Sequence, residues 1–202
     1  MNLPIPDFIL YAQHGWADNH FGISRLAQSL GTRQTLIVTP NLGWLNTWLK
    51  MEPLIKKVET IAIANFNQYP HTPVRIVGHS MGGLLWLEIL NRHPQWWQNV
   101  HSLVLVGSPV GGSNLAMTID PFSLAMGGDL AVNRIKIAEA IAIKISTLSI
   151  AGDINGNSDG TVTISSTKFG YVTSKILKDI NHPRLKNHPL VAKAIRDFWA
   201  EL

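Results

Sequence analysis

The feature that most constrains the fold is an alternation of short apolar runs with stretches of helical periodicity along the chain. Short, continuously apolar runs are typical of parallel strands, which are buried on both faces, and the helices between them form the crossover connections. The runs lie at residues 8–13, 35–40, 74–79, 103–108, 145–151 and 171–177. The sequence therefore predicts an α/β fold, a doubly wound and mostly parallel sheet of about six strands with helices on both faces.

Helix boundaries can be recognised between these runs. The apolar stripe that includes Leu26 and Leu30 is followed by Gly31, which we expect to end that helix. Pro53 is predicted at the first position of the next helix, where its missing N–H costs nothing. Further helices are expected over residues 82–93 and 191–202.

One segment, residues 110–144, is longer than a crossover helix requires. Glycine pairs at 111–112 and 127–128 punctuate it, which favours a small cap or lid with hinges. An ordinary helix with a long loop stays open as the alternative. The chain has 202 residues, the size of one domain, so we expect a single domain over 1–202 that carries this segment as an insertion.

Composition excludes several classes of function. The chain has no cysteine, which excludes disulfides, thiolate metal sites and cysteine nucleophiles. The net charge of +4 is spread along the chain, and the densest basic group, at 175–196, is interleaved with Asp179 and Asp197, so no nucleic-acid partner is expected. No apolar stretch approaches the roughly 18 residues of a membrane helix, and the start lacks the basic region of a signal peptide. We expect a cytoplasmic protein without a transmembrane segment.

The third apolar run ends in Gly78, His79, Ser80, Met81 and Gly82, and an apolar helix follows at once. This is a G-x-S-x-G motif in the strand, turn and helix context of a nucleophile elbow. Such a turn holds the serine in a strained backbone conformation and requires small residues two before and two after it, which Gly78 and Gly82 provide. Ser80 is therefore the predicted nucleophile, and a tight turn with an inert serine is the alternative.

No cofactor or metal motif is complete. A dinucleotide fingerprint would need glycine in place of Ser80, and a phosphate-binding loop would need lysine in place of Ser113. A calcium loop that starts at Asn155 would end at Ser166, where glutamate is required. We expect no cofactor and no metal.

A serine nucleophile needs a base and an orienting acid, which follow an elbow of this kind in the order serine, acid, histidine. His182 follows the last predicted strand, where a loop returns to the carboxyl edge of the sheet, and it is the predicted base. His188, at the start of the final helix, is the alternate, with a cap role more natural for it. His93 and His101 are expected far from that edge.

The acid is expected in the loop after the fifth apolar run, which reads GDINGNSDGTV. Asp153 lies directly at the strand end. Asp159 precedes Gly160 and Val162 in a turn that could direct its carboxylate to the histidine. The residues alone leave both aspartates as candidates.

The oxyanion of a tetrahedral intermediate needs two backbone N–H donors. Met81, the residue after the nucleophile, is predicted to supply one. The second is expected from the loop after the first strand, through the N–H of Trp16 or Gly15. His14 is expected to hold this loop by hydrogen bonding.

Together these residues resemble the α/β-hydrolase superfamily, specifically its small lipase- and esterase-like members. The resemblance spans nearly the whole chain: HG after the first strand, GHSMGG at the elbow, GSPVGGSNLA after the next strand, SDGTV, and a histidine ahead of the last helix. Ser108 stands where such lipases commonly have threonine. The resemblance implies Asp159 as the acid, with Asp153 as an alternate, and His182 as the base.

We therefore expect a serine hydrolase that cleaves carboxylic esters through an acyl-enzyme. The expected partner is a small-molecule ester or lipid-like substrate, with transient contact with a membrane surface allowed. Only 15% of residues are charged, against about 25% in ordinary domains, and this low fraction together with the apolar, glycine-punctuated segment 110–144 favours the lipid-like substrate. An acyltransferase, a thioesterase or an amidase would use the same residues. A hydrolase-like binding module without catalysis is the alternative from another class. The oligomeric state is not predicted.

Overall fold

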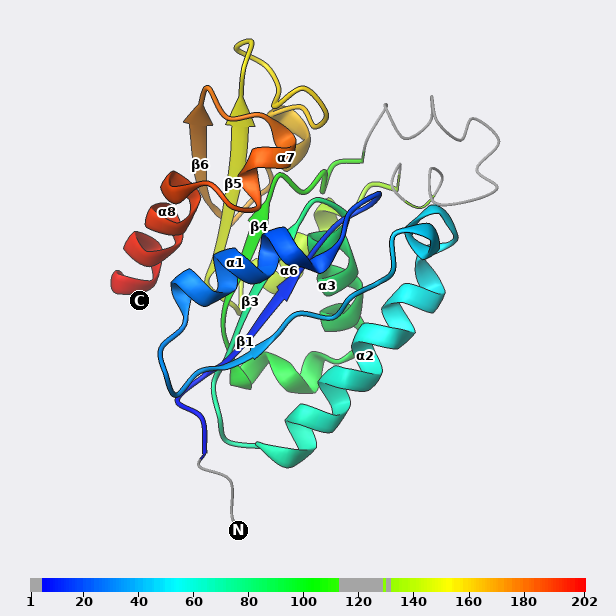
Figure 1. The fold of residues 1–202 in the computed structure, drawn as a ribbon, viewed down its shortest axis with the longest axis vertical. Helices are drawn as coiled ribbons and strands as arrows, with labels where there is room; N and C mark the ends of the chain where they lie inside the picture. The colour runs from blue at the N-terminus through cyan, green and yellow to red at the C-terminus, as the bar shows by residue number, and fades with distance from the viewer. Residues whose placement is uncertain (1–4, 113–128, 130–131) are drawn as a thin grey trace.

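The structure, a computed structural model, describes residues 5–112, 129 and 132–202. Six strands form one sheet in the order β2-β1-β3-β4-β5-β6, and every neighbouring pair is parallel (Figure 1). The strands are β1 Ile9–Gln13, β2 Leu36–Val38, β3 Val74–His79, β4 Val100–Val106, β5 Thr147–Asp153 and β6 Thr173–Lys178. The predicted α/β fold with a parallel sheet is confirmed.

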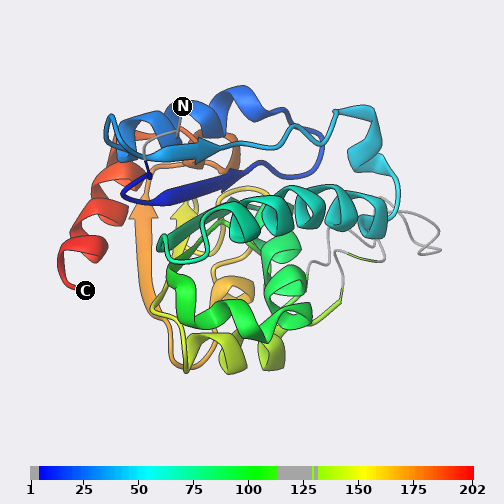
Figure 2. The ribbon, with the colours of Figure 1, turned by 90° about the horizontal axis from the view of Figure 1, so that it is seen from below.

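Helices cover both faces of this sheet. The α-helices are α1 His20–Leu30, α2 Met51–Gln68, α3 Met81–Arg92, α6 Ile135–Ala142, α7 His182–Leu185 and α8 Pro189–Ala200. Short 3-10 helices are η1 Leu45–Trp48, η2 Pro94–Asn99 and η3 Ser165–Thr167. Helices α1 and α8 pack on one face, whereas α2, α3 and α6 pack on the other (Figures 1 and 2).

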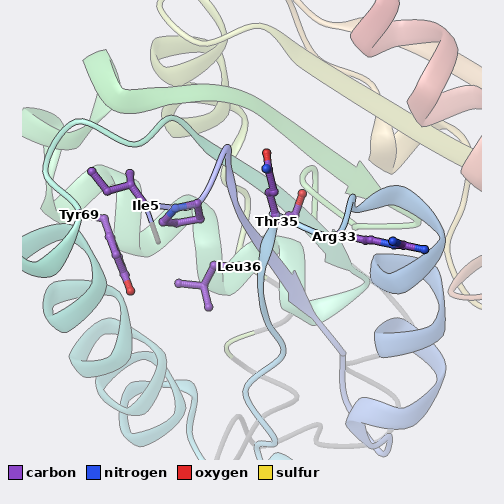
Figure 3. A pocket seen from close by; sticks show the side chains of 7 residues that line it. Ile5, Arg33, Thr35, Leu36 and Tyr69 are labelled. Carbon is purple, nitrogen blue, oxygen red and sulfur yellow. The ribbon is translucent and has the colours of Figure 1, made fainter. Parts of the chain in front are cut away.

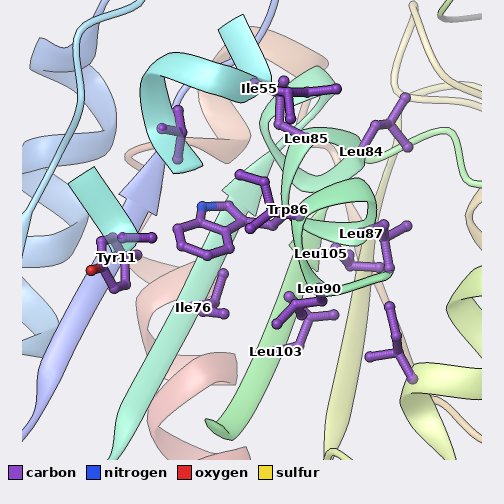
Figure 4. Packing of buried hydrophobic residues seen from close by; sticks show 14 of the residues in the cluster. Tyr11, Ile55, Ile76, Leu84, Leu85, Trp86, Leu87, Leu90, Leu103 and Leu105 are labelled. Atoms are coloured by element: carbon purple, nitrogen blue, oxygen red, sulfur yellow. The ribbon is translucent and has the colours of Figure 1, made fainter. Parts of the chain in front are cut away.

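The strands alternate their side chains between two apolar layers. Leu10 and Val77 point to the layer under α1 and α8, and their neighbours Tyr11 and Ile76 point to the layer under α2 and α3. Figure 4 shows the second layer, where Trp86 of α3 packs against Tyr11 with ring centroids 4.7 Å apart. Burial on both faces explains why the strands are continuously apolar in sequence.

Several predicted boundaries differ from the structure by one to three residues, and two of these differences have a clear physical reason. Helix α2 begins at Met51, so Pro53 is the third residue of the helix and not the first. A proline is tolerated there because the N–H groups of the first turn have no partner within the helix. Strand β4 begins at Val100, three residues before the predicted run. The prediction started too late because the polar His101 and Ser102 interrupt the apolar pattern of the strand.

Most of the predicted cap or lid, residues 110–144, lies outside the described residues. Its described part includes α6, which packs on α3, and Arg134 just before it. The Arg134 side chain is buried, and its Nε donates to Glu88 Oε1 of α3 at 2.8 Å. Its Nη1 donates to the carbonyl oxygens of Asp129 and Val132. Arg134 thus fastens the start of α6 to the core.

Replacing Arg134 with methionine is expected to lower the free energy of unfolding by about 2 to 4 kcal/mol, because Glu88 and two carbonyl groups lose a charged donor. Urea unfolding followed by circular dichroism measures this. The matched control is Lys193→Met, which removes the exposed pair of Lys193 with Asp197 and should cost less than about 0.5 kcal/mol. Equal losses in the two variants would contradict the role of Arg134.

Candidate active site

Ser80 occupies a sharp turn at the carboxyl end of β3. The strand ends at His79 and α3 starts at Met81, and Ser80 between them has φ 55° and ψ −127°. A side chain in this region of backbone space is strained by about 1 to 3 kcal/mol and needs support from its surroundings. The Ser80 N–H donates to the carbonyl oxygen of Val106 in β4 at 2.8 Å, and the Ser80 carbonyl accepts from Gly83 at 3.0 Å.

Three glycines allow the backbone to crowd around Ser80. A methyl group at Gly78 would overlap the backbone of Gly83, and one at Gly82 would overlap the Gln13 carbonyl oxygen at the end of β1. A Cβ at Gly15 would lie 2.8 Å from the Ser80 Cβ and 3.2 Å from the Met81 nitrogen. The elbow and the loop after β1 are therefore in direct contact.

His182 and Asp159 are joined by a short hydrogen bond. The distance from His182 Nδ1 to Asp159 Oδ2 is 2.7 Å, and both side chains are buried. The other carboxylate oxygen, Oδ1, accepts from the N–H groups of Thr161 at 2.9 Å and Val162 at 2.7 Å. Because an ionised carboxylate can only accept, the Nδ1–H donates to Asp159, and in the neutral ring Nε2 is then the nitrogen with a lone pair that can accept a proton.

Ser80 and His182 lie against consecutive residues of one strand end. The Ser80 N–H bonds to Val106, while the His182 ring lies over Gly107, where a Cβ would be 3.2 Å from both Cε1 and Nδ1 of the ring. Among the described residues no hydrogen bond joins the Ser80 hydroxyl to His182. Such bonds are often long before substrate binds, and rotation about the serine Cα–Cβ bond changes their length.

His79 contributes to this site, although no role for it is predicted from the sequence. Its ring lies 4.8 Å from the His182 ring, and its Nε2 donates to the His182 carbonyl oxygen at 3.1 Å. Burial is the main cause that holds the pKa of His79 well below its ordinary value, and the neighbouring His182 is the second cause. His79 is therefore a neutral hydrogen-bond donor that ties the His182 turn to the elbow. Its position inside the G-x-S-x-G motif is the only sequence signal for this.

The two alternates lie in local turns and caps. The Asp153 carboxylate accepts from the N–H groups of Asn155 and Gly156 at the start of the loop. His188 caps α8, with its Nδ1 accepting from the Leu190 N–H at 3.2 Å. In the described structure neither side chain hydrogen-bonds to Ser80 or His182.

The histidines expected far from the carboxyl edge do lie at the other end of the sheet. His93 ends α3 and contacts Glu59 at 2.8 Å, and His101 packs against Phe8 near the start of β4. His182, expected in a loop, is the first residue of the short helix α7, with Asn181 as its cap.

The loop after β1 is held from its outer side by residues 40–47. His14 Nε2 accepts from the Leu42 N–H at 3.0 Å, and its Nδ1 donates to the Gly15 carbonyl at 3.0 Å. Ala17 has φ 50°, and its N–H donates to Thr47 Oγ1 at 2.9 Å. Thr47 is fully buried and was missed in the sequence, where a lone threonine gives no signal. No hydrogen-bond acceptor for the Met81 N–H occurs among the described residues, so this donor is available at the elbow.

The described residues contain no group of three or more histidine, cysteine, aspartate or glutamate side chains placed to hold a metal ion. A groove of about 370 Å³ lies elsewhere, at the amino end of β2, lined by residues that include Ile5, Arg33 and Tyr69 (Figure 3). None of the predicted site residues lines this groove.

Solved structures with a similar fold include a lipase, a thioesterase and the protein Est1E. The mature Bacillus licheniformis lipase BlEst2 matches with a TM-score of 0.71 and 16% identity, over 98% of this chain and 94% of that one. Est1E from Butyrivibrio proteoclasticus matches with a TM-score of 0.69 and 14% identity, over 98% and 89%. RedJ, a thioesterase of the prodiginine biosynthetic pathway in Streptomyces coelicolor, matches with a TM-score of 0.57 and 17% identity, over 98% and 86%. At these identities the likeness shows the fold.

Sequence comparison identifies the family. No curated protein matches the chain. The family model described as PGAP1-like alpha/beta domain matches residues 45–201, which is well over half of the sequence and includes Ser80, Asp159 and His182. This protein therefore belongs to the PGAP1-like alpha/beta domain family and is a member of the α/β-hydrolase superfamily.

Proposed function

We propose that this protein is a serine hydrolase that cleaves carboxylic esters through an acyl-enzyme. The observation that carries the proposal is the 2.7 Å hydrogen bond between His182 and Asp159, beside the strained Ser80 at the carboxyl edge of the sheet. A nucleophile, a base and an acid in this order and arrangement can activate a serine hydroxyl.

In the acylation step Ser80 Oγ attacks the ester carbonyl carbon while His182 Nε2 takes the hydroxyl proton. The tetrahedral intermediate carries a negative oxygen, for which the Met81 N–H and the N–H of Gly15 or Trp16 are the proposed donors. The intermediate collapses as the C–O bond to the alcohol breaks, and His182 gives its proton to the departing oxygen. The acyl group then remains as an ester of Ser80.

In the second step water attacks the acyl-enzyme while His182 Nε2 takes a proton from it. Collapse of the second intermediate releases the carboxylic acid and returns the proton to Ser80. Asp159 accepts the Nδ1–H throughout, so that it keeps Nε2 as the acceptor and stabilises the imidazolium that forms twice in the cycle.

The acceptor and the leaving group are not fixed by these residues. Among the structural relatives are proteins described as a lipase and as a thioesterase, and both chemistries need the same nucleophile, base and donors. We favour oxygen esters, including lipid-like ones. Comparing kcat/KM for an ester, a thioester and an amide with the same acyl group ranks the three, with the ester expected to be fastest.

Labelling with a fluorophosphonate tests the proposal directly. The probe is expected to modify the protein at one serine, with displacement of fluoride, because only an activated hydroxyl attacks the phosphorus rapidly. Peptide mass spectrometry should place the added mass on Ser80, and heat-unfolded protein is the control that should not react. A folded protein that stays unlabelled, with no ester turnover, would favour the non-catalytic binding module.

A further inference from the structure

Residues 44–49 present four large apolar side chains to solvent next to the candidate site. The exposed fractions are 51% for Trp44, 73% for Leu45, 40% for Trp48 and 57% for Leu49. The other exposed large apolar side chains of the described residues occur singly along the sequence. Single exposed apolar residues are ordinary, whereas a cluster marks a surface that contacts something apolar. We call these four residues the apolar platform.

The apolar platform is fixed to the loop that holds Gly15 and Trp16. The Trp48 ring packs against Trp16 with centroids 4.4 Å apart, and against Trp44 at 5.8 Å. On the inner side of the same 3-10 helix, the Thr47 hydroxyl donates to the Trp44 carbonyl at 2.6 Å and accepts from Ala17. The apolar platform therefore has a buried polar side that holds it in place, and the outward exposure of its apolar side chains is built into the fold.

Positive charge borders the apolar platform. Residues 41–51 contain no aspartate or glutamate, and lysines follow at positions 56 and 57. The Lys57 ammonium lies beside the start of this segment, where it donates to the Asn41 carbonyl at 2.7 Å. Two carboxylates lie nearby: Glu52, to which Arg92 donates at both oxygens, and Asp129, which accepts from the Met51 N–H at 2.7 Å. The cations Lys50, Lys56, Lys57 and Arg92 outnumber these two carboxylates. Apolar side chains with a positive border suit an anionic lipid surface.

We propose that the apolar platform docks on a lipid surface that carries anionic headgroups. Tryptophan suits the boundary between headgroups and acyl chains, because its ring is apolar and its N–H is polar, and the two leucines reach the apolar layer. The four side chains are few compared with the roughly 20 to 30 residues that each partner gives to a stable protein interface. Docking brings an ester carried by the lipid to the rim of the site. That last consequence rests on the proposed function, whereas docking itself does not.

The experiment measures how the Ser80→Ala protein partitions onto vesicles, so that no lipid is hydrolysed during the measurement. Flotation with vesicles of phosphatidylcholine and phosphatidylglycerol is compared with flotation on phosphatidylcholine alone. The double variant L45S/L49S is expected to bind the anionic vesicles at least about tenfold more weakly, because two leucines no longer enter the apolar layer. The matched control is I143S/L202S, which removes two similarly exposed side chains near the amino edge of the sheet and should bind as its parent does.

Circular dichroism confirms that each variant is folded. Absence of binding by the parent, or equal binding by parent and L45S/L49S, overturns the proposal. Light scattering tests the alternative occupant, a second copy of the chain. A concentration-dependent dimer that becomes monomeric in L45S/L49S would show that the second copy covers the apolar platform, and this result would also overturn the proposal. Failure of the proposed function is seen separately, as absence of labelling at Ser80 in a protein that still binds vesicles.

Discussion

Alanine in place of Ser80 is expected to lower kcat for ester hydrolysis by about 10⁴- to 10⁶-fold, because removal of a serine nucleophile leaves only the contribution of substrate binding and the oxyanion donors. The Ser80 hydroxyl has no hydrogen-bond partner in the described residues, so the substitution breaks no hydrogen bond among them. Unfolding by heat should therefore be almost unchanged. Initial rates with a chromogenic ester measure the loss of kcat, and a fluorophosphonate assay of the same samples measures the loss of labelling.

The matched control for this prediction is Ser108→Ala. Ser108 lies two residues after the end of β4, and Ser80 directly follows β3. Ser108 is fully buried, and among the described residues its hydroxyl makes one long contact of 3.5 Å, to the Gly78 carbonyl. Its loss is expected to change kcat by less than about tenfold, because the proposed mechanism makes no use of its hydroxyl. Retention of more than about 1% of the activity in Ser80→Ala would contradict Ser80 as the nucleophile.

The elbow could be predicted from sequence because its requirements are local. Gly78 and Gly82 are needed within five residues of one another, and the structure explains each by a backbone atom that a Cβ would overlap. The apolar pattern of the strands is also local, which is why the order of elements was predictable. Strand β4 shows the limit: Ser102 is fully buried yet polar, so the pattern placed the start of the strand too late.

The partners of the elbow depend on contacts between distant segments. Asp153 and Asp159 lie six residues apart, and only the path of the loop, with the Asp159 N–H donating to the Val162 carbonyl, turns Asp159 toward His182. Likewise Thr47 contacts Ala17 thirty residues away, and His79 contacts His182 over 103 residues. Buried polar residues of this kind have no periodic signal, so the sequence predicts a role for neither His79 nor Thr47.

Asparagine in place of Asp159 is expected to lower kcat by about 10⁴-fold while leaving the fold intact. The amide oxygen would stay where Oδ1 now accepts from Thr161 and Val162, so the amide nitrogen would face His182 Nδ1. Since that nitrogen is a donor, Nδ1 would have to accept and the proton would move to Nε2. His182 could then no longer take the Ser80 proton, and the rate of acylation should fall in single-turnover measurements.

Asp153→Asn is the matched comparison, because it makes the same chemical change six residues away. Its amide oxygen can still accept from Asn155 and Gly156, so kcat should remain within about threefold and stability within about 1 kcal/mol. The reverse ranking of the two variants would transfer the role of the acid to Asp153. A tenfold or smaller loss in Asp159→Asn would instead mean that the hydrogen bond to His182 holds the α7 turn in place without setting the protonation state of its ring.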